Sequence, residues 1–220
     1  NYGLDRLDLK KTTSQSFVEF KDNRFMTKSK DNELFTLKDD GYFYYYQQEK
    51  GTFRKLEVPQ PAFEYILSTT IDANNILWVF TSNNDNRSYQ INKTKEGLSL
   101  TPNHLFKHSE KLRWAFPEGQ LVYFIDETYS LYEYDFNNQQ QYFIADLKTE
   151  IEKRGEVSSI IKQQNDYYIG FKNSGLIVLK YMSDQKIKYQ IQSTEIHSGI
   201  FCLMKDKYQD IVWVGTDGQG

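Results

Sequence analysis

The 220-residue sequence has little cysteine, proline or histidine and no excess of basic charge. Its one cysteine, Cys202, rules out an intrachain disulfide framework, and its position in an apolar run predicts a small core residue. The formal net charge is -3, from 27 basic and 30 acidic residues, and no basic stripe stands out. We therefore expect that nucleic acid is not a partner.

Long apolar runs are missing as well. No run approaches the ~18 residues that a membrane-spanning helix needs. The sequence also does not open on the charged and then apolar segments of a secretory signal peptide. We expect any targeting or membrane segment to lie outside this sequence.

Motifs for catalysis and metal binding are not found in the sequence. It has neither a Gly-x-Ser-x-Gly elbow nor a His-Glu-x-x-His motif. His104 and His108 stand four residues apart, but in a predicted loop rather than on a helix, which argues against a shared metal. The glycine-bearing run 215–220 predicts a strand turn rather than a phosphate loop, because no Gly-Lys-Ser/Thr and no helix start follow it. We expect no catalytic residues, no metal and no cofactor.

Aromatic residues, by contrast, are abundant, with 17 Tyr and 15 Phe. They lie in short apolar blocks between polar turns, a pattern that predicts β-strands. An aromatic or branched residue recurs in an apolar block that follows one polar turn and precedes another. It does so with spacings of 43, 44, 46 and 45 residues, at Phe35, Trp78, Val122, Tyr168 and Trp213. A constant period of ~40 to 50 residues with about four strands per unit is typical of propeller blades, and the block pattern disfavours helical repeats of similar period.

The sequence therefore predicts an all-β fold, a β-propeller of four-stranded antiparallel blades with about five repeats of ~44 residues. Residues 1–220 would form a single propeller segment. It would begin with the third and fourth strands of a blade, at 3–8 and 16–20, and finish with the first and second strands of another, at 200–204 and 211–214. We expect Trp78 and Trp213 to pack between blades. Residues 117–120 read as a tight turn, and 147–156 as a segment with room for one helical turn.

Both ends of the sequence resemble the two-component regulator propeller repeat. The run DIVWVGTDGQG near the end of the sequence matches the first half of the repeat pattern, and the start YGLDRLD matches its later half. The matching positions are Gly3, Leu4, Asp8, Asp210, Trp213, Gly215, Thr216 and Gly220. The copies between them are degenerate.

This resemblance implies the extracytoplasmic sensor region of a hybrid two-component sensor histidine kinase that detects an oligosaccharide and controls transcription of glycan-utilisation genes. It implies a periplasmic portion of an inner-membrane protein, a neighbouring propeller or all-β domain in the same protein, and a homodimeric receptor. Family rings have about seven blades, so five repeats would be part of a larger propeller. We expect no enzymatic activity from this segment, although the intact protein would be a kinase.

Ligand-binding residues are expected on one face of such a propeller, where the turns between second and third strands meet the connections between blades. The turns are 38–41, 82–87, 126–130, 172–175 and 217–220, and the connections are 57–63, 102–111, 147–156 and 192–199. Aromatic faces and planar polar groups hold sugars, which predicts a ligand-binding role for seven residues. They are Arg87, His108, Arg113, Trp114, Tyr129, Arg154 and His197. A protein-interaction scaffold and a propeller lyase or glycosidase remain alternatives, because fold alone does not decide function.

Overall fold

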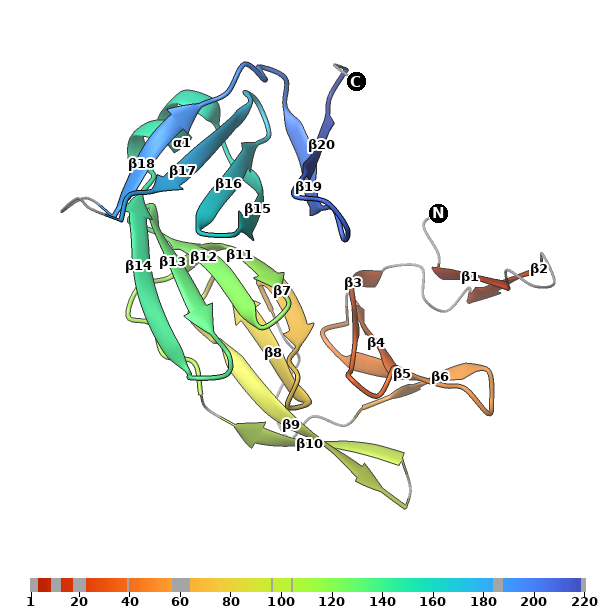
Figure 1. Cartoon of the computed structure of the whole chain (residues 1–220). Coiled ribbons are helices and arrows are strands. Elements are labelled where there is room, and N and C mark those ends of the chain that lie inside the picture. Colours follow the sequence, from red (N-terminus) through yellow and green to blue (C-terminus); the bar gives the residue numbers. More distant parts are fainter. Residues whose placement is uncertain are drawn as a thin grey trace. The chain divides into compact units, whose positions relative to one another are not determined.

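The computed structural model describes residues 4–8, 13–17, 23–38, 40–56, 64–95, 97–103, 105–183 and 188–218. The chain forms two compact units, Asn1–Ser109 and Glu110–Gly220, called here the N-terminal and C-terminal units. Both are built from antiparallel strands (Figure 1). That residues 1–220 make one propeller segment stays a prediction.

The strands of the N-terminal unit form three sheets. They are β1 (Leu4–Asp8) and β2 (Thr13–Phe17), then β3 (Asn23–Lys28), β4 (Leu34–Lys38), β5 (Phe43–Gln47) and β6 (Thr52–Lys55), then β7 (Ile66–Ile71), β8 (Ile76–Thr81), β9 (Arg87–Thr94) and β10 (Gly97–Asn103).

The C-terminal unit also has three sheets and one helix in its described residues. They are β11 (Leu112–Glu118), β12 (Leu121–Asp126), β13 (Ser130–Asp135) and β14 (Gln140–Asp146), then α1 (Lys148–Arg154), then β15 (Val157–Gln163), β16 (Asp166–Phe171), β17 (Leu176–Tyr181) and β18 (Tyr189–Ser193), then β19 (Ile200–Lys205) and β20 (Val212–Thr216).

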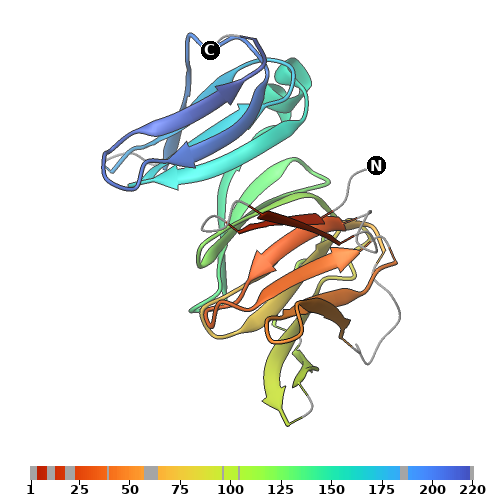
Figure 2. The same cartoon turned by 90° about the vertical axis from the view of Figure 1, so that its right-hand side faces the viewer.

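The predicted blades are confirmed. The described residues make four four-stranded sheets, in each of which consecutive strands pair antiparallel, and a two-stranded sheet near each end. The β19–β20 hairpin lies against β15 and β16 in the C-terminal unit (Figures 1 and 2). The arrangement is the one expected for blades of a propeller-like fold.

The pairing register corrects the position of one repeat marker. Every first strand has a β-bulge after its first residue, which pairs with Lys38, Thr81, Asp126, Phe171 or Thr216 of the second strand. Three residues before these five positions lie Phe35, Trp78, Tyr123, Tyr168 and Trp213. Tyr123 is therefore the equivalent residue, and Val122 is one residue out of phase. A one-residue error matters because neighbouring side chains of a strand point to opposite faces.

The apolar cores lie between neighbouring sheets of each unit. In the N-terminal unit Phe35 and Leu37 of β4 pack with Leu77 and Val79 of β8. In the C-terminal unit Tyr123 and Ile125 of β12 pack with residues of β15, β16 and β17. All six residues of β8 are buried. Leu77 and Val79 pack with β4 residues, while Trp78 stacks on Phe80 and Phe106 packs edge-to-face on Phe80.

The two repeat tryptophans each donate a hydrogen bond to an aspartate, but they differ in burial. The Trp78 indole donates a hydrogen bond of 3.0 Å to Asp72, and the Trp213 indole donates one of 2.9 Å to Asp206. Trp78 is 0% exposed, as expected for a core residue. Trp213 is 53% exposed, so its predicted core position is wrong. In the described residues β20 pairs only with β19, which leaves the Trp213 ring largely uncovered.

Three smaller expectations are also corrected. Cys202 is exposed rather than buried, with its sulfur against Gly215. Helix α1 has 7 residues, more than one turn, because Ile151 and Arg154 are both buried on its inner side. Pro117 belongs to β11, opposite Val122, so the predicted turn begins later. A proline is tolerated there because β11 is an edge strand of its sheet.

The β16–β17 hairpin contains an ion pair that should make stability depend on pH. Lys180 lies 2.5 Å from Asp166, and the backbone N–H of Tyr181 donates to the same carboxylate at 2.9 Å. Desolvation raises the pKa of Asp166, but these two hydrogen bonds outweigh it and hold the pKa below its ordinary value of 3.8. The ionised form is therefore favoured in the folded chain.

Replacing Asp166 with asparagine should lower the urea midpoint at neutral pH. A depressed carboxyl pKa contributes stability that is present above the unfolded value and lost as the pH falls through the folded value. The difference from the wild type should therefore shrink as the pH drops below about 3.8. Urea titrations of both proteins over this pH range would measure it, and a difference that does not change with pH would contradict the prediction.

Candidate functional site

The predicted loop face is held together in each unit by a repeated backbone hydrogen bond. The residue after each second strand donates its N–H to the carbonyl just before the first strand of the same sheet. The pairs are Ser82 with Tyr65 at 2.9 Å, Glu127 with Lys111 at 2.8 Å, Lys172 with Glu156 at 2.8 Å, and Asp217 with Gly199 at 2.9 Å. The turns between second and third strands therefore lie beside the connections between blades. The described residues do not include four of the positions discussed from the sequence, namely the connection 57–63, Gly3, His104 and Gly220.

An open hollow of about 370 Å³ lies on this face of the N-terminal unit. Its lining residues come from the turn after β8 and from the segment after β10, and they are Asn84, Asn86, Phe106, Lys107, His108 and Ser109. His108 is the residue among these that the sequence singled out. The hollow therefore brings one predicted ligand residue together with two amides and an aromatic ring.

Hydrogen bonds hold the two amides in place. The Asn86 oxygen accepts the backbone N–H of Thr81 at 2.8 Å, and the Asn86 amide nitrogen donates to the Asn84 oxygen at 3.4 Å. The Asn84 amide nitrogen donates to the Ser109 carbonyl at 3.3 Å, which ties the turn to the later segment. Phe106, which also lines the hollow, packs edge-to-face on Phe80, with ring centroids 5.4 Å apart. The lining therefore combines oriented amides with a packed aromatic ring.

Arg87 follows the same turn, and its guanidinium is paired with the neighbouring Asp85. Its Nε donates to one carboxylate oxygen of Asp85 at 2.8 Å, and its Nη2 forms an ion pair with the other. The Arg87 side chain is only 11% exposed. This two-point pair orients the guanidinium and shapes the turn beside the hollow.

Arg113 and Tyr129 come together on the loop face of the C-terminal unit. The Arg113 guanidinium lies 4.5 Å from the centroid of the Tyr129 ring. Tyr129 has a positive φ of 67°, and its carbonyl accepts the N–H of Leu147, so the ring is set by a tight turn. Arg113 is exposed, whereas Trp114 is half-buried against the core. Of this predicted pair, Arg113 is the one that reaches solvent.

Arg154 is buried, and its guanidinium is hydrogen-bonded to other residues of the chain. Its guanidinium donates to Glu150 at 2.7 Å, to the Ser174 carbonyl at 3.2 Å and to the Ser193 hydroxyl at 2.9 Å. These contacts join α1 to the turn after β16 and to the end of β18. Its position indicates a structural role. His197 is exposed in the connection between β18 and β19.

Among the described residues no three His, Cys, Asp or Glu side chains converge as a metal site. Asn84, Asn86 and Phe106 were not singled out from the sequence. The run of asparagines in the turn 82–87 was the available signal, because amide side chains can donate and accept hydrogen bonds. Only the fold brings Phe106 into the same hollow.

A comparison with solved structures supports the fold. No family model and no curated protein matches the sequence. Among solved structures, the extracellular domain of a candidate one-component system from B. thetaiotaomicron is similar, with a TM-score of 0.53 and 19% sequence identity. The match covers 89% of this chain and 26% of that chain, so this chain spans about a quarter of its length. In the described residues no helix is long and apolar enough to cross a membrane. At this identity the likeness shows that the chain has the fold of part of that domain.

Proposed function

We propose that this chain is a ligand-sensing propeller segment of an extracytoplasmic receptor and that it binds an oligosaccharide on its loop face. The observation that carries the proposal is the hollow at His108, whose lining combines oriented amides and an imidazole with an aromatic ring. Planar hydrogen-bonding groups over an apolar surface match the alternating hydroxyls and C–H faces of a sugar.

Two further observations support a sensor. The fold is similar to part of the extracellular domain of a candidate one-component system. The motifs at the ends of the sequence resemble the two-component regulator propeller repeat. In that setting the receptor is a hybrid histidine kinase of the inner membrane, its sensor region is periplasmic, and its output is transcription of glycan-utilisation genes.

A sensor must couple its ligand to a change in arrangement. A ligand shifts an equilibrium only if it binds one arrangement better than another. Packed blades change little internally, so we expect the change where this segment meets a neighbouring propeller, an all-β domain or a second subunit. The exposed apolar side chains of the β19–β20 hairpin, Phe201, Met204 and Trp213, would suit such a protein contact.

Calorimetric titration with a panel of oligosaccharides tests the proposal. His108→Ala and Asn84→Ala should each weaken binding of the oligosaccharide that the wild type binds by roughly ten-fold. Lys95→Ala is the control, since Lys95 is exposed on the β9–β10 turn and is not part of the hollow. Light scattering should show a change of assembly when the sugar binds to the receptor.

Other results would contradict the proposal. Unchanged affinity in both variants would rule out the hollow as the site. Turnover of the panel would favour the propeller lyase or glycosidase. Tight binding of a protein with no response to any sugar would favour the interaction scaffold.

A further inference from the structure

A second and larger recess lies in the N-terminal unit, among residues that the loop-face hollow does not use. It has a volume of about 800 Å³ and lies between the first two complete blades. Its walls come from the turn between β3 and β4, from the end of β5 with the following turn, and from the β9–β10 hairpin. This recess is called the interblade groove. Its volume is within the range of small-molecule sites.

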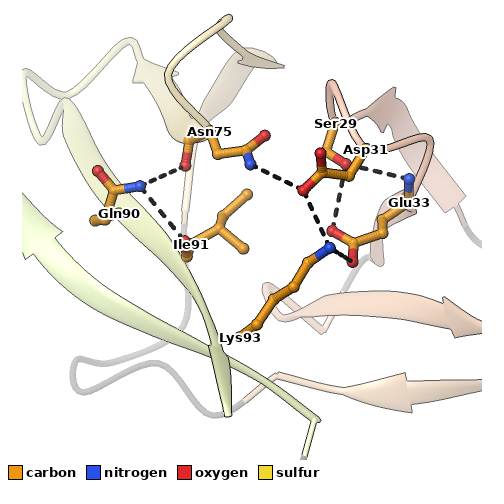
Figure 3. A network of polar contacts seen from close by, with 7 residues as sticks. All are labelled: Ser29, Asp31, Glu33, Asn75, Gln90, Ile91 and Lys93. Atoms are coloured by element: carbon orange, nitrogen blue, oxygen red, sulfur yellow. Dashed lines mark hydrogen bonds and ion pairs between the residues drawn. The ribbon is translucent and has the colours of Figure 1, made fainter.

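One wall of the groove holds a lysine between two carboxylates. The Lys93 ammonium lies 3.0 Å from Asp31 and 3.1 Å from Glu33, reaching from β9 to the opposite turn (Figure 3). The hydrogen bond to Lys93 is the largest influence on the Asp31 carboxyl and lowers its pKa, and the same bond raises the pKa of Lys93. The pairing therefore favours the charged forms of both Asp31 and Lys93.

Further hydrogen bonds orient this wall. Asn75 donates its amide to Asp31 at 3.4 Å, and the Ser29 hydroxyl donates to Glu33 at 3.3 Å (Figure 3). The Ser29 oxygen also accepts the backbone N–H of Glu33 at 3.1 Å. The carboxylates therefore point in set directions before any ligand arrives, which reduces the entropy lost on binding.

The floor of the groove is closely packed. Gly97 has a φ of 132°, and a Cβ placed there would lie 2.3 Å from the Tyr45 hydroxyl. Only glycine lets β10 lie this close to Tyr45. The Tyr45 hydroxyl also accepts a hydrogen bond from Gln47 at 3.3 Å, and Leu34 and Leu98 add apolar surface. Strand backbone and a buried ring thus set the shape of this part of the groove.

The chemistry of the walls selects among ligand classes. A cation finds Lys93 already between the two carboxylates, and an anion meets Asp31, Glu33 and Glu49, which outnumber Lys50 and Lys93. Charged and amide side chains lie among the apolar residues of the lining, which does not suit a purely hydrophobic ligand. What remains is a neutral ligand with many hydroxyls that can accept from Lys93, donate to the carboxylates and rest on apolar carbon.

We infer that the interblade groove is a second binding site and that it takes a short neutral oligosaccharide. It shares with the proposed function only the class of ligand. Binding here does not require the hollow at His108 to be occupied.

Titration of the isotope-labelled full chain tests this inference by backbone amide chemical shifts. The probes are cellotriose, maltotriose, xylotriose and chitotriose, each at millimolar concentration. At least one should give saturable shifts at Gln48, Thr94 and Gly97. Lys93→Met should weaken that binding by roughly ten-fold or more, because it removes a charged hydrogen-bond donor and leaves the two carboxylates without it. Asp31→Ala, which removes a hydrogen-bond acceptor from the same wall, should weaken it too.

Matched controls separate this site from the loop-face hollow. Lys95→Met removes an exposed lysine two residues from Lys93 and should leave the groove shifts unchanged. His108→Ala should also leave them unchanged while it weakens any shifts at Asn84 and Asn86. Shifts confined to the hollow would overturn the groove site and keep the proposed function, and shifts confined to the groove would do the reverse. No shifts in the groove with any of the four sugars, or groove shifts unaffected by both groove variants, would overturn the inference.

Discussion

Replacing Trp78 with alanine should lower the free energy of unfolding by about 3–5 kcal/mol. Trp78 is 0% exposed, so its removal leaves a cavity that the surrounding side chains can fill only in part. It also takes the indole donor away from Asp72, a carboxylate that is itself 1% exposed. Urea denaturation followed by circular dichroism would measure the loss.

Trp213 supplies a matched control for this prediction. It occupies the same repeat position and donates to Asp206 as Trp78 donates to Asp72, but its ring is 53% exposed. Trp213→Ala should therefore cost much less than Trp78→Ala, because little apolar surface returns to water. Equal losses for the two variants would show that burial does not distinguish the two positions.

Replacing Arg154 with methionine should cost about 3 kcal/mol of folding stability, because it removes one partner of a buried ion pair. The Arg154 and Glu150 side chains are 7% and 16% exposed, so the carboxylate would lose its partner in a poorly hydrated place. The Ser174 carbonyl and the Ser193 hydroxyl would each lose a donor as well. Thermal and urea unfolding should both show the loss.

An exposed ion pair on the same face is the control. Lys172 and Glu156 lie 2.6 Å apart with side chains 57% and 59% exposed. Lys172→Met should change stability by about 0–1 kcal/mol, since water screens such pairs. Arg154→Lys should restore only part of the loss, because an ammonium cannot make the three directed contacts of the guanidinium. If Arg154→Met unfolds like the wild type but loses ligand affinity, the sequence-based role of Arg154 in binding would be restored.

The sequence predicted the strands and their repetition well. Apolar blocks separated by polar turns are a local property, so the 20 strands of the described residues could be anticipated to within a few residues at most positions. The loop face was also predictable, because the order of strands in a blade decides which turns share an end. His108 could be placed on that face for the same reason.

What the sequence could not determine was which neighbour covers a given side chain. Val122 and Tyr123 are adjacent and both suit a strand, and only the pairing across the β-bulge showed that Tyr123 occupies the repeat position. Arg154 reads as a polar loop residue until α1 brings it against Ser174 and Ser193.

Sequence by itself determined the repeat period, the strand order and the face on which the turns meet, because these follow from alternation and spacing along the chain. Tertiary structure alone decided that Trp78 is buried while Trp213 is exposed, that Arg154 joins three elements, and that the β9–β10 hairpin borders a groove at Lys93. Each of these depends on contacts between residues far apart in the sequence, and local patterns carry no information on which sheet packs against which.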